Sequence, residues 1–186
     1  MNVKSLITKQ AQILEQFFAE KDTQIVRATD EICIRLETGH KIVVFGNGGS
    51  AAQAQHFTAE LVNKFLKLRR ALPALSLTTD TSSLTSIAND SSFDYVFSRQ
   101  LEALGNKGDV VLALSTSGKS QNIIRALHTA GEKELFRIGL TGEGGGMMES
   151  LCDILLDVPS KDTPRVQEVH LFFLHFLCQE IEERIS

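Results

Sequence analysis

Two segments that lie far apart in the chain carry side chains of the types that bind metals or move protons. His56 and Glu60 stand four residues apart in a stretch with helical periodicity, so they share one face of the expected helix. A neutral imidazole and a carboxylate at this spacing can bind one Zn²⁺ or hydrogen-bond to each other. Spacing alone favours the second outcome, a simple pair on the surface.

The second set lies on the last expected helix, from about Pro164 to Arg184, and comprises Gln167, His170 and His175. His175 occurs in the run FFLHFLC, where a histidine is usually a core residue with satisfied hydrogen bonds. Near a cleft, however, such a histidine can titrate or bind metal. Spacing does not choose between His170 and His175 as the partner of Gln167.

A glycine-rich loop, GNGGS at residues 46–50, follows an apolar run and opens a helical pattern. Glycines let the backbone turn sharply, and a helix N-terminus offers free N–H groups to an anion. The loop also fits the loose dinucleotide pattern G-x-G-x-x-A. Because Asp80 lies too far along to serve as the acidic ribose contact, we disfavour a nicotinamide site.

A hydroxyl-rich loop, STSGKS at residues 115–120, again lies between an apolar run and a helical pattern. Hydroxyl donors together with a helix dipole suit a monophosphate. The segment does not have the GxxxxGK[ST] spacing of a Walker A loop. An ordinary capped turn would explain two of the four hydroxyls, so their number favours phosphate binding.

A third polar segment, TTDTSS at residues 78–83, also follows a strand-like run, and Asn89 and Asp90 come shortly after it. Polar exits at one edge of a parallel sheet make a hydrophilic cleft, which a polyhydroxylated substrate needs. The glycines of residues 142–146 read as a plain turn.

Elements that could position these loops follow from the alternation of apolar runs with helical patterns, which predicts an α/β fold with a five-stranded parallel sheet covered on both faces. No linker or internal repeat is present, so we expect one domain over 1–186, with an N-terminal helical segment at 1–38. We expect strands near 41–45, 74–77, 110–114, 136–140 and 154–158, and helices near 4–20, 22–37, 50–64, 82–88, 94–104, 120–133, 147–152 and 164–184.

Composition excludes several classes of protein. The 186 residues carry a net charge of −4, which disfavours nucleic acid and anionic lipid as partners. No apolar run reaches membrane-spanning length, and the N-terminus lacks the apolar region of a signal peptide. Cys33, Cys152 and Cys178 are far apart and odd in number, which favours buried thiols in a reducing compartment. We therefore expect a cytoplasmic protein.

Together these motifs resemble the phosphoheptose isomerase family of the SIS (sugar isomerase) fold, over essentially the whole chain. The shared stretches are GNGGSAAQAQHFTAEL, LTTDTSSLTSIANDSSFDYVFSRQLEALGNKGDV, STSGKSQNI, LTGEGGGMM and DTPRVQEVHLFFLH. Glycine- and serine-rich pieces occur widely in this fold, whereas HFxxEL combined with RVQEVHxxxxH is far more specific.

The resemblance implies one Zn²⁺ per subunit, bound by His56, Glu60, Gln167 and His175. It implies a homotetramer with sites shared between subunits, and conversion of sedoheptulose 7-phosphate to D-glycero-D-manno-heptose 7-phosphate for bacterial cell-surface polysaccharide. The implied substrate contacts are Asn47, Gly48, Gly49, Ser50, Glu60, Asn89, Asp90, Ser115, Thr116, Ser117, Ser120 and Gln167. One departure is Lys64, where the family often has arginine, because lysine lacks the planar fork that makes bidentate contacts.

Such an isomerisation moves a proton between C1 and C2 through an enediol, and it needs no redox cofactor. We expect Glu60 to act as the base and His175 as its acid/base partner; Glu60 is a ligand, a base or both in turn. Two alternatives are a non-catalytic SIS protein that binds the replication initiator and a sugar-phosphate sensor. Neither explains why Glu60 and His175 are both present.

Overall fold

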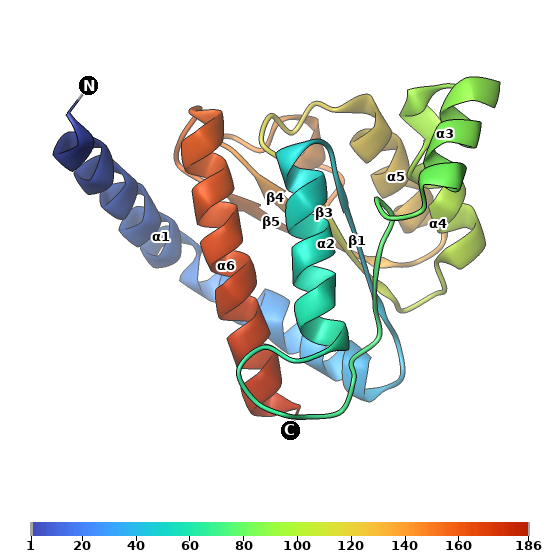
Figure 1. Cartoon of the computed structure of the whole chain (residues 1–186), viewed down its shortest axis with the longest axis horizontal. Coiled ribbons are helices and arrows are strands. Elements are labelled where there is room, and N and C mark those ends of the chain that lie inside the picture. The colour runs from blue at the N-terminus through green and yellow to red at the C-terminus, as the bar shows by residue number, and fades with distance from the viewer. Residues whose placement is uncertain (1, 186) are drawn as a thin grey trace.

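The computed structural model describes residues 2–185 and contains one five-stranded sheet with helices on both of its faces (Figure 1). The elements are α1 (Val3–Glu37), β1 (Ile42–Gly46), α2 (Gly49–Val62), β2 (Ala74–Ser76), α3 (Thr81–Asp90), η1 (Phe93–Tyr95), α4 (Ser98–Leu104), β3 (Val110–Ser115), α5 (Gln121–Glu132), β4 (Phe136–Thr141), η2 (Gly146–Met148), β5 (Ile154–Asp157) and α6 (Thr163–Arg184).

The sheet is parallel throughout and has the strand order β2-β1-β3-β4-β5. This confirms the predicted five-stranded parallel sheet. Every residue of β1 and β3 is buried, which explains why these strands read as unbroken apolar runs. The chain order reverses between β1 and β3, and ligands of such sheets bind at the carboxyl ends of the strands beside this point.

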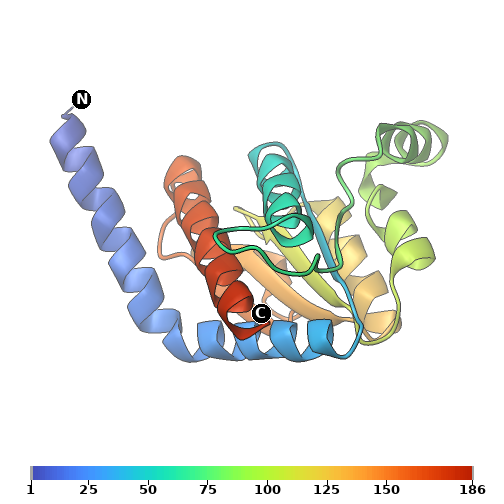
Figure 2. The ribbon, with the colours of Figure 1, turned by 60° about the horizontal axis from the view of Figure 1, so that its bottom comes forward.

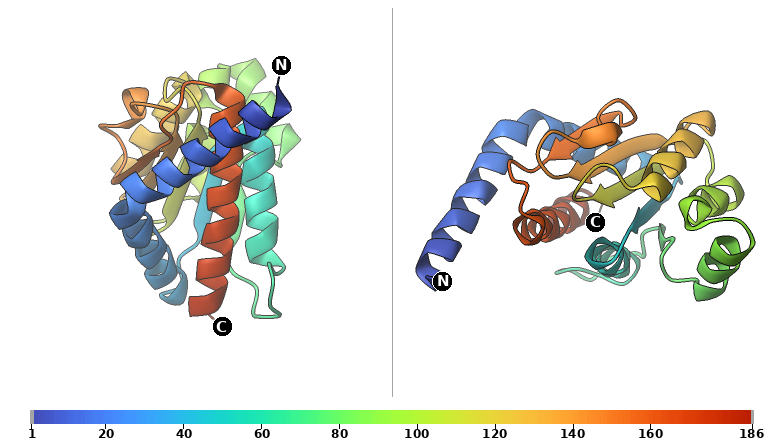
Figure 3. Two further views of the ribbon diagram at one scale, coloured as in Figure 1. Left: turned by 90° about the vertical axis from the view of Figure 1, so that its left-hand side faces the viewer. Right: turned by 90° about the horizontal axis from the view of Figure 1, so that it is seen from above.

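Alternate residues of each strand supply two separate cores. Val110, Leu112 and Leu114 of β3 belong to the core under α1, α2 and α6. Val111 and Ala113 point to the opposite face and pack with residues of α4 and α5. The view from above shows the sheet between these two layers (Figure 3). The helix pair α2 and α6, which carries the metal-type side chains, therefore lies on one face.

The N-terminal segment differs from the prediction of two helices, 4–20 and 22–37, which was wrong. It forms one helix of 35 residues, Val3–Glu37, that bends about midway (Figure 2). Neither glycine nor proline occurs within it, so no residue breaks its hydrogen bonding. Its first half stands away from the sheet and exposes Val3 and Ile7.

Two other predicted helices were too long. The segment 94–104 splits into the 3₁₀ turn η1 and the seven-residue α4, and the Ser92 hydroxyl caps η1 by accepting from the N–H of Asp94 (3.2 Å). The segment 147–152 holds only the 3₁₀ turn η2, because Gly144, Gly145 and Gly146 have positive φ and prevent a helix from starting. Other boundaries differ from the prediction by one or two residues.

No helix among residues 2–185 combines the length and the apolar character needed to cross a bilayer.

Candidate active site

The loops at the carboxyl ends of β1, β3 and β4 meet at one edge of the sheet, at the top of Figure 1. The N–H of Gly142 donates to the carbonyl of Thr116 (3.1 Å), and the N–H of Met147 donates to Gly118 (2.9 Å). Gly118 lies so close to residues 142–146 that a Cβ on Gly118 would stand 2.1 Å from the Gly145 carbonyl oxygen. The glycines of 142–146 thus support the hydroxyl-rich loop, beyond the plain turn that we predicted.

The loop after β1 brings α6 close to the start of α2. Gly48 takes the N-cap position of α2 with φ 54°, a backbone conformation that glycine adopts without strain. A Cβ on Gly49 would lie 2.6 Å from Nε2 of Gln167. Only glycine lets Gln167 approach the N-terminus of α2 in this way.

Asn47 in the same loop forms a reciprocal amide pair with Asn122 in the first turn of α5, with N···O distances of 3.0 and 2.8 Å. This pair joins the two predicted substrate loops. Sequence reasoning missed Asn122; the available signal was a polar residue among the buried positions of α5, where its side chain is 3% exposed.

The loop after β3 holds its hydroxyls without using them as caps. Ser120 occupies the N-cap of α5, yet its hydroxyl makes no capping hydrogen bond and instead accepts from the Ser115 hydroxyl (3.4 Å). A cavity of about 400 Å³ lies beside the loop, lined by Thr116 and Ser117 together with Lys119 and Lys161. Glu143 lines the same cavity and pairs with Lys161 (3.8 Å). The hydroxyls, Lys119 and the N-terminus of α5, which follows the loop, form a setting that suits an anion.

Below the loops, α2 and α6 bring three of the predicted side chains together. Nε2 of His56 lies 2.8 Å from Nε2 of His175, and Nδ1 of His56 lies 3.8 Å from Oε1 of Glu60. Burial lowers the pKa of His175 below 6.5, and the nearby His56 adds to this, while the Glu60 carboxylate opposes it. His175 is thus neutral near neutral pH and can accept a proton.

His170 takes a different place and does not join this cluster. It is fully buried, and its Nε2 donates to the backbone carbonyl of Thr141 (3.1 Å). Burial lowers the pKa of His170 to about 4, so the ring is neutral in the folded protein. The choice that spacing left open is therefore made by the structure: His175 faces α2, and His170 faces β4.

Gln167 lies at the loop end of the helix pair. It precedes His175 by eight residues, about 12 Å along a helix. Its side chain meets Gly49, and its backbone carbonyl accepts from Nε2 of Gln53 (2.7 Å). The cluster of His56, Glu60 and His175 lies roughly two turns away.

The donor types of the cluster suit zinc, which binds imidazole nitrogen and carboxylate oxygen. The converging Nε2 atoms of His56 and His175 would supply two ligands, and Glu60 is on the same helix face as His56. Within residues 2–185, no three His, Cys, Asp or Glu side chains are already arranged as a complete metal site.

Asn89 and Asp90 end α3, beyond the β2 edge of the sheet (Figure 1). The Asn89 amide donates to the Asp90 carboxylate (2.8 Å), and within residues 2–185 no hydrogen bond joins either side chain to the loops after β1 and β3. The structure thus does not bring these two predicted substrate residues to the other loops.

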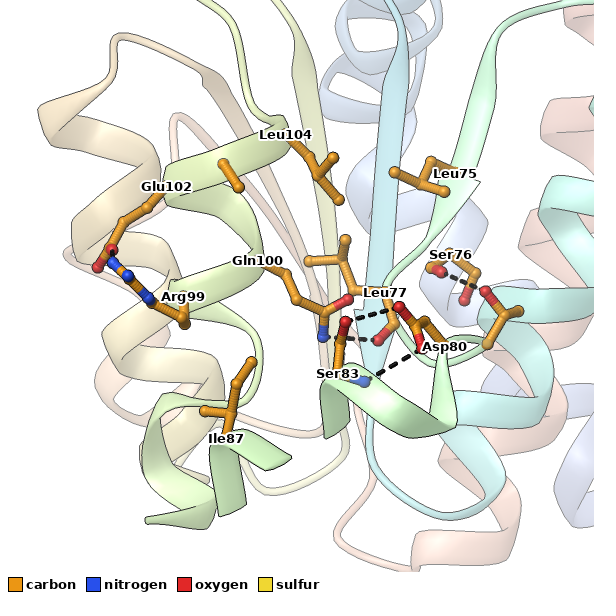
Figure 4. Close-up of a pocket in the computed structure, with 12 residues that line it drawn as sticks. Leu75, Ser76, Leu77, Asp80, Ser83, Ile87, Arg99, Gln100, Glu102 and Leu104 are labelled. Atoms are coloured by element: carbon orange, nitrogen blue, oxygen red, sulfur yellow. Dashed lines mark hydrogen bonds and ion pairs between the residues drawn. The ribbon is translucent and has the colours of Figure 1, made fainter. Parts of the chain in front are cut away.

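A larger cavity, of about 700 Å³, lies between β2, α3 and α4 (Figure 4). Its polar groups already have partners in the protein. Asp80 caps α3 through Ser83, the Gln100 amide donates to two backbone carbonyls, and Arg99 pairs with Glu102. The cluster of His56, Glu60 and His175 lies elsewhere, so size alone does not mark the active site.

Phe65 completes the surroundings of His175, because its ring stacks on the imidazole with centroids 5.7 Å apart and planes 25° apart. Sequence reasoning did not single out this contact, since Phe65 follows α2 in an irregular segment with no periodic pattern.

Comparison with known proteins places this geometry in a family. Residues 7–142 match the sequence model of the SIS domain. The chain is 54% identical over 160 residues to the phosphoheptose isomerase of Campylobacter jejuni, which covers 86% of each chain. It is 48% identical over 184 residues to that of Aliarcobacter butzleri, which covers 94% of this chain and 97% of the relative.

Solved structures of phosphoheptose isomerases have the same fold as this chain. The phosphoheptose isomerase of Neisseria gonorrhoeae superposes with a TM-score of 0.90 at 40% identity over 97% of both chains. That of Francisella tularensis gives a TM-score of 0.90 at 35% identity, over 97% of this chain and 96% of its own. The chain therefore belongs to the SIS domain family and, within it, to the phosphoheptose isomerases, which are sugar-phosphate isomerases.

Proposed function

We propose that the protein converts sedoheptulose 7-phosphate to D-glycero-D-manno-heptose 7-phosphate, for bacterial heptose and cell-surface polysaccharide biosynthesis. One observation carries the proposal: His56 and Glu60 of α2 meet His175 of α6 on the face of the sheet beside the loops of residues 46–50 and 115–120. A carboxylate and a neutral imidazole are the pair that aldose–ketose interconversion requires.

Two proton transfers follow from this pair. Glu60 removes the carbon-bound proton at one of C1 and C2 and returns it at the other, through an enediol. His175 moves the proton between the two sugar oxygens, which its lowered pKa supports because a neutral imidazole can take up a proton and return it. No electrons are gained or lost, so the reaction balances without a redox partner.

The substrate phosphate binds the loop of residues 115–120. Three groups of donors support this placement. The hydroxyl of Ser120 makes no capping hydrogen bond, the hydroxyl of Ser117 can donate, and the first turn of α5 offers free N–H groups to an anion. Asn47, Gly48, Gly49 and Ser50 face the sugar from the adjoining loop. Asn89 and Asp90 complete the set only if α3 approaches the loops when substrate binds.

Zn²⁺ is the proposed cofactor, with His56, Glu60, Gln167 and His175 as its ligands; Gln167, whose side chain meets Gly49 in this structure, joins the other three only if it turns toward them when the metal binds. When bound, it would polarise the sugar oxygens as a Lewis acid. Support comes from the converging Nε2 atoms of the two histidines. A glutamine amide is a weak ligand, so we expect a chelator to remove the metal.

We propose a homotetramer, because apolar side chains that a monomer leaves in water need cover. Phe172 on α6 is 50% exposed, and Ile7 on the outstanding half of α1 is 64% exposed. We propose a cytoplasmic location from the free cysteines. Burial raises the pKa of Cys33 to about 11 and that of Cys178 to about 12, so these thiols are unreactive.

The test is turnover of sedoheptulose 7-phosphate by metal-analysed protein, with Glu60→Gln as the principal variant. This change removes the base but keeps the shape, so we expect turnover to fall while substrate still binds. His128→Gln, an exposed histidine of α5, is the matched control and keeps wild-type rates. No turnover by metal-loaded wild type would contradict the proposal and favour the non-catalytic alternative.

A further inference from the structure

The carboxylate of Glu182, near the end of α6, is buried in a backbone turn. It accepts hydrogen bonds from three successive N–H groups, those of Phe65 (2.9 Å), Leu66 (2.7 Å) and Lys67 (2.7 Å). Only 1% of Glu182 is exposed. Successive N–H groups that converge on one anion form a nest, here filled by a side chain of the same protein. The segment that leaves α2 is thus tied to α6 (Figure 1).

Arg69 connects the same carboxylate to the end of α2. Its Nε lies 3.4 Å from Oε1 of Glu182, at ion-pair distance, and both side chains are 2% exposed. Its two Nη atoms donate to the carbonyls of Glu60 and Leu61, each at 2.8 Å. These carbonyls belong to the last turn of α2, where a cation is favourable. Arg69 therefore holds the backbone of Glu60 itself.

Phe65 makes the second connection, toward His175. Its N–H is one of the three donors to Glu182, and its ring stacks on the His175 imidazole. A single buried carboxylate thereby reaches both proposed proton-transfer groups, Glu60 through Arg69 and His175 through Phe65.

Burial alone would raise the pKa of Glu182, but the three N–H donors and the charge of Arg69 outweigh it and hold the pKa below 4.5. Burying charges is costly unless they have partners. A surface turn of this length could form without a buried ion pair, so the pair serves more than the turn itself. The arrangement fixes one geometry for the segment 63–69.

We propose that Glu182 and Arg69 are positioning residues that fix Glu60 and His175 relative to each other, and that they set kcat rather than substrate affinity. The part that concerns kcat rests on the proposed isomerase function. Neither residue touches the substrate, since both act through the α2 backbone and the Phe65 ring.

The main variant is Glu182→Gln, which keeps the size but removes the charge and turns an NH₂ group toward backbone donors. We expect kcat to fall about ten- to a hundredfold, with KM within about twofold, because small displacements of reacting groups cost that much. Glu183→Gln is the matched control, since it makes the same change one residue along on an exposed side chain. Ile181→Ala lowers stability in the buried core of α6, and because Ile181 takes no part in the hydrogen bonds to Glu182, we expect this variant to keep kcat.

All variants are measured at a temperature where circular dichroism shows them folded, and histidine-labelled samples are compared by NMR in parallel. We expect Glu182→Gln to move the ring signals of His56 and His175 but not that of exposed His128. Should Glu182→Gln fail to fold, Arg69→Lys gives the same reading, because it keeps the charge but loses the two-carbonyl fork.

Wild-type kcat together with unchanged His56 and His175 signals in the folded variant would overturn the positioning role. An equal loss of kcat in Ile181→Ala would overturn it too, since stability alone would then explain the effect. If wild type itself lacks turnover, the function fails, and the histidine signals still decide whether the pair positions the cluster.

Discussion

The loop end and the far end of the α2–α6 pair are built on different physical terms. At the loop end, Gly49 and Gln167 touch because a side chain is missing, and the hydroxyls of residues 115–120 with Lys119 line space for an anion. At the far end, Glu182 and Arg69 fill the space with buried charges that pair with each other and with backbone groups of the protein. The first end is arranged to receive a ligand and the second to hold its neighbours still.

His170 and His175 show the same contrast within one helix. They are five residues apart, yet one is buried against a backbone carbonyl and the other faces a second histidine. Residue type therefore does not decide the role of a histidine; the element packed against it does.

The largest expected effect separates these two histidines. His175→Gln should lower kcat by about a hundredfold or more, since a general acid/base contributes at least that much. Its stability should change little because the ring is only partly buried. Steady-state kinetics and thermal unfolding of the same sample measure both. A stability loss with normal turnover would show that His175 is a core residue like His170, so that the two histidines do not differ in role.

The pH dependence of stability tests His170. Its folded pKa of about 4 lies below the ordinary 6.5, so the unfolded chain binds the proton more readily. The neutral ring thus contributes stability that is complete above pH 6.5 and is lost as the pH falls toward 4, by about 3 kcal/mol in all. Urea unfolding across this range should show the loss in wild type and a flatter profile in His170→Leu. If the free energy of unfolding depended on pH equally in wild type and His170→Leu, His170 would not be the group responsible for the loss.

The next largest effect, a rise in KM, is expected in the loop of residues 115–120. Ser117→Ala combined with Ser120→Ala should raise KM about tenfold or more, because each change removes one donor to a charged phosphate. Unfolding should be almost unaffected, since Ser120 makes no capping bond. Ser91→Ala, outside the loops, is the control. An unchanged KM in the double variant would place the phosphate elsewhere.

The smallest effect on stability is expected for Gly49→Ala, which sharpens the role of Gln167. The new methyl would meet the end of a flexible side chain, so the free energy of unfolding should change by less than about 1 kcal/mol. Displacing Gln167 should nevertheless lower zinc content measured by metal analysis after dialysis. Unaltered zinc content would argue that Gln167 is not a ligand.

Much of the fold was predictable because its signals are local. Buried strands flanked by helices produce apolar runs such as IVVF of β1, and strand exits collect glycines and hydroxyls within a few residues. The prediction failed for α1, because residues 4–20 and 22–37 were read as two helices although no residue between them stops a helix. It also failed after Ser92 and at Gly144 to Gly146, where caps and positive φ shortened helices.

The sequence by itself determined the parallel sheet, the order of its loops and the chemical types gathered there, since each depends on neighbours within one or two turns. Only the tertiary structure decided that His175 rather than His170 meets His56, that Asn122 joins the two loops, and that Glu182 reaches Arg69 and Phe65. These contacts join residues more than 70 positions apart, and they follow from how whole helices pack on the sheet, which no local pattern encodes.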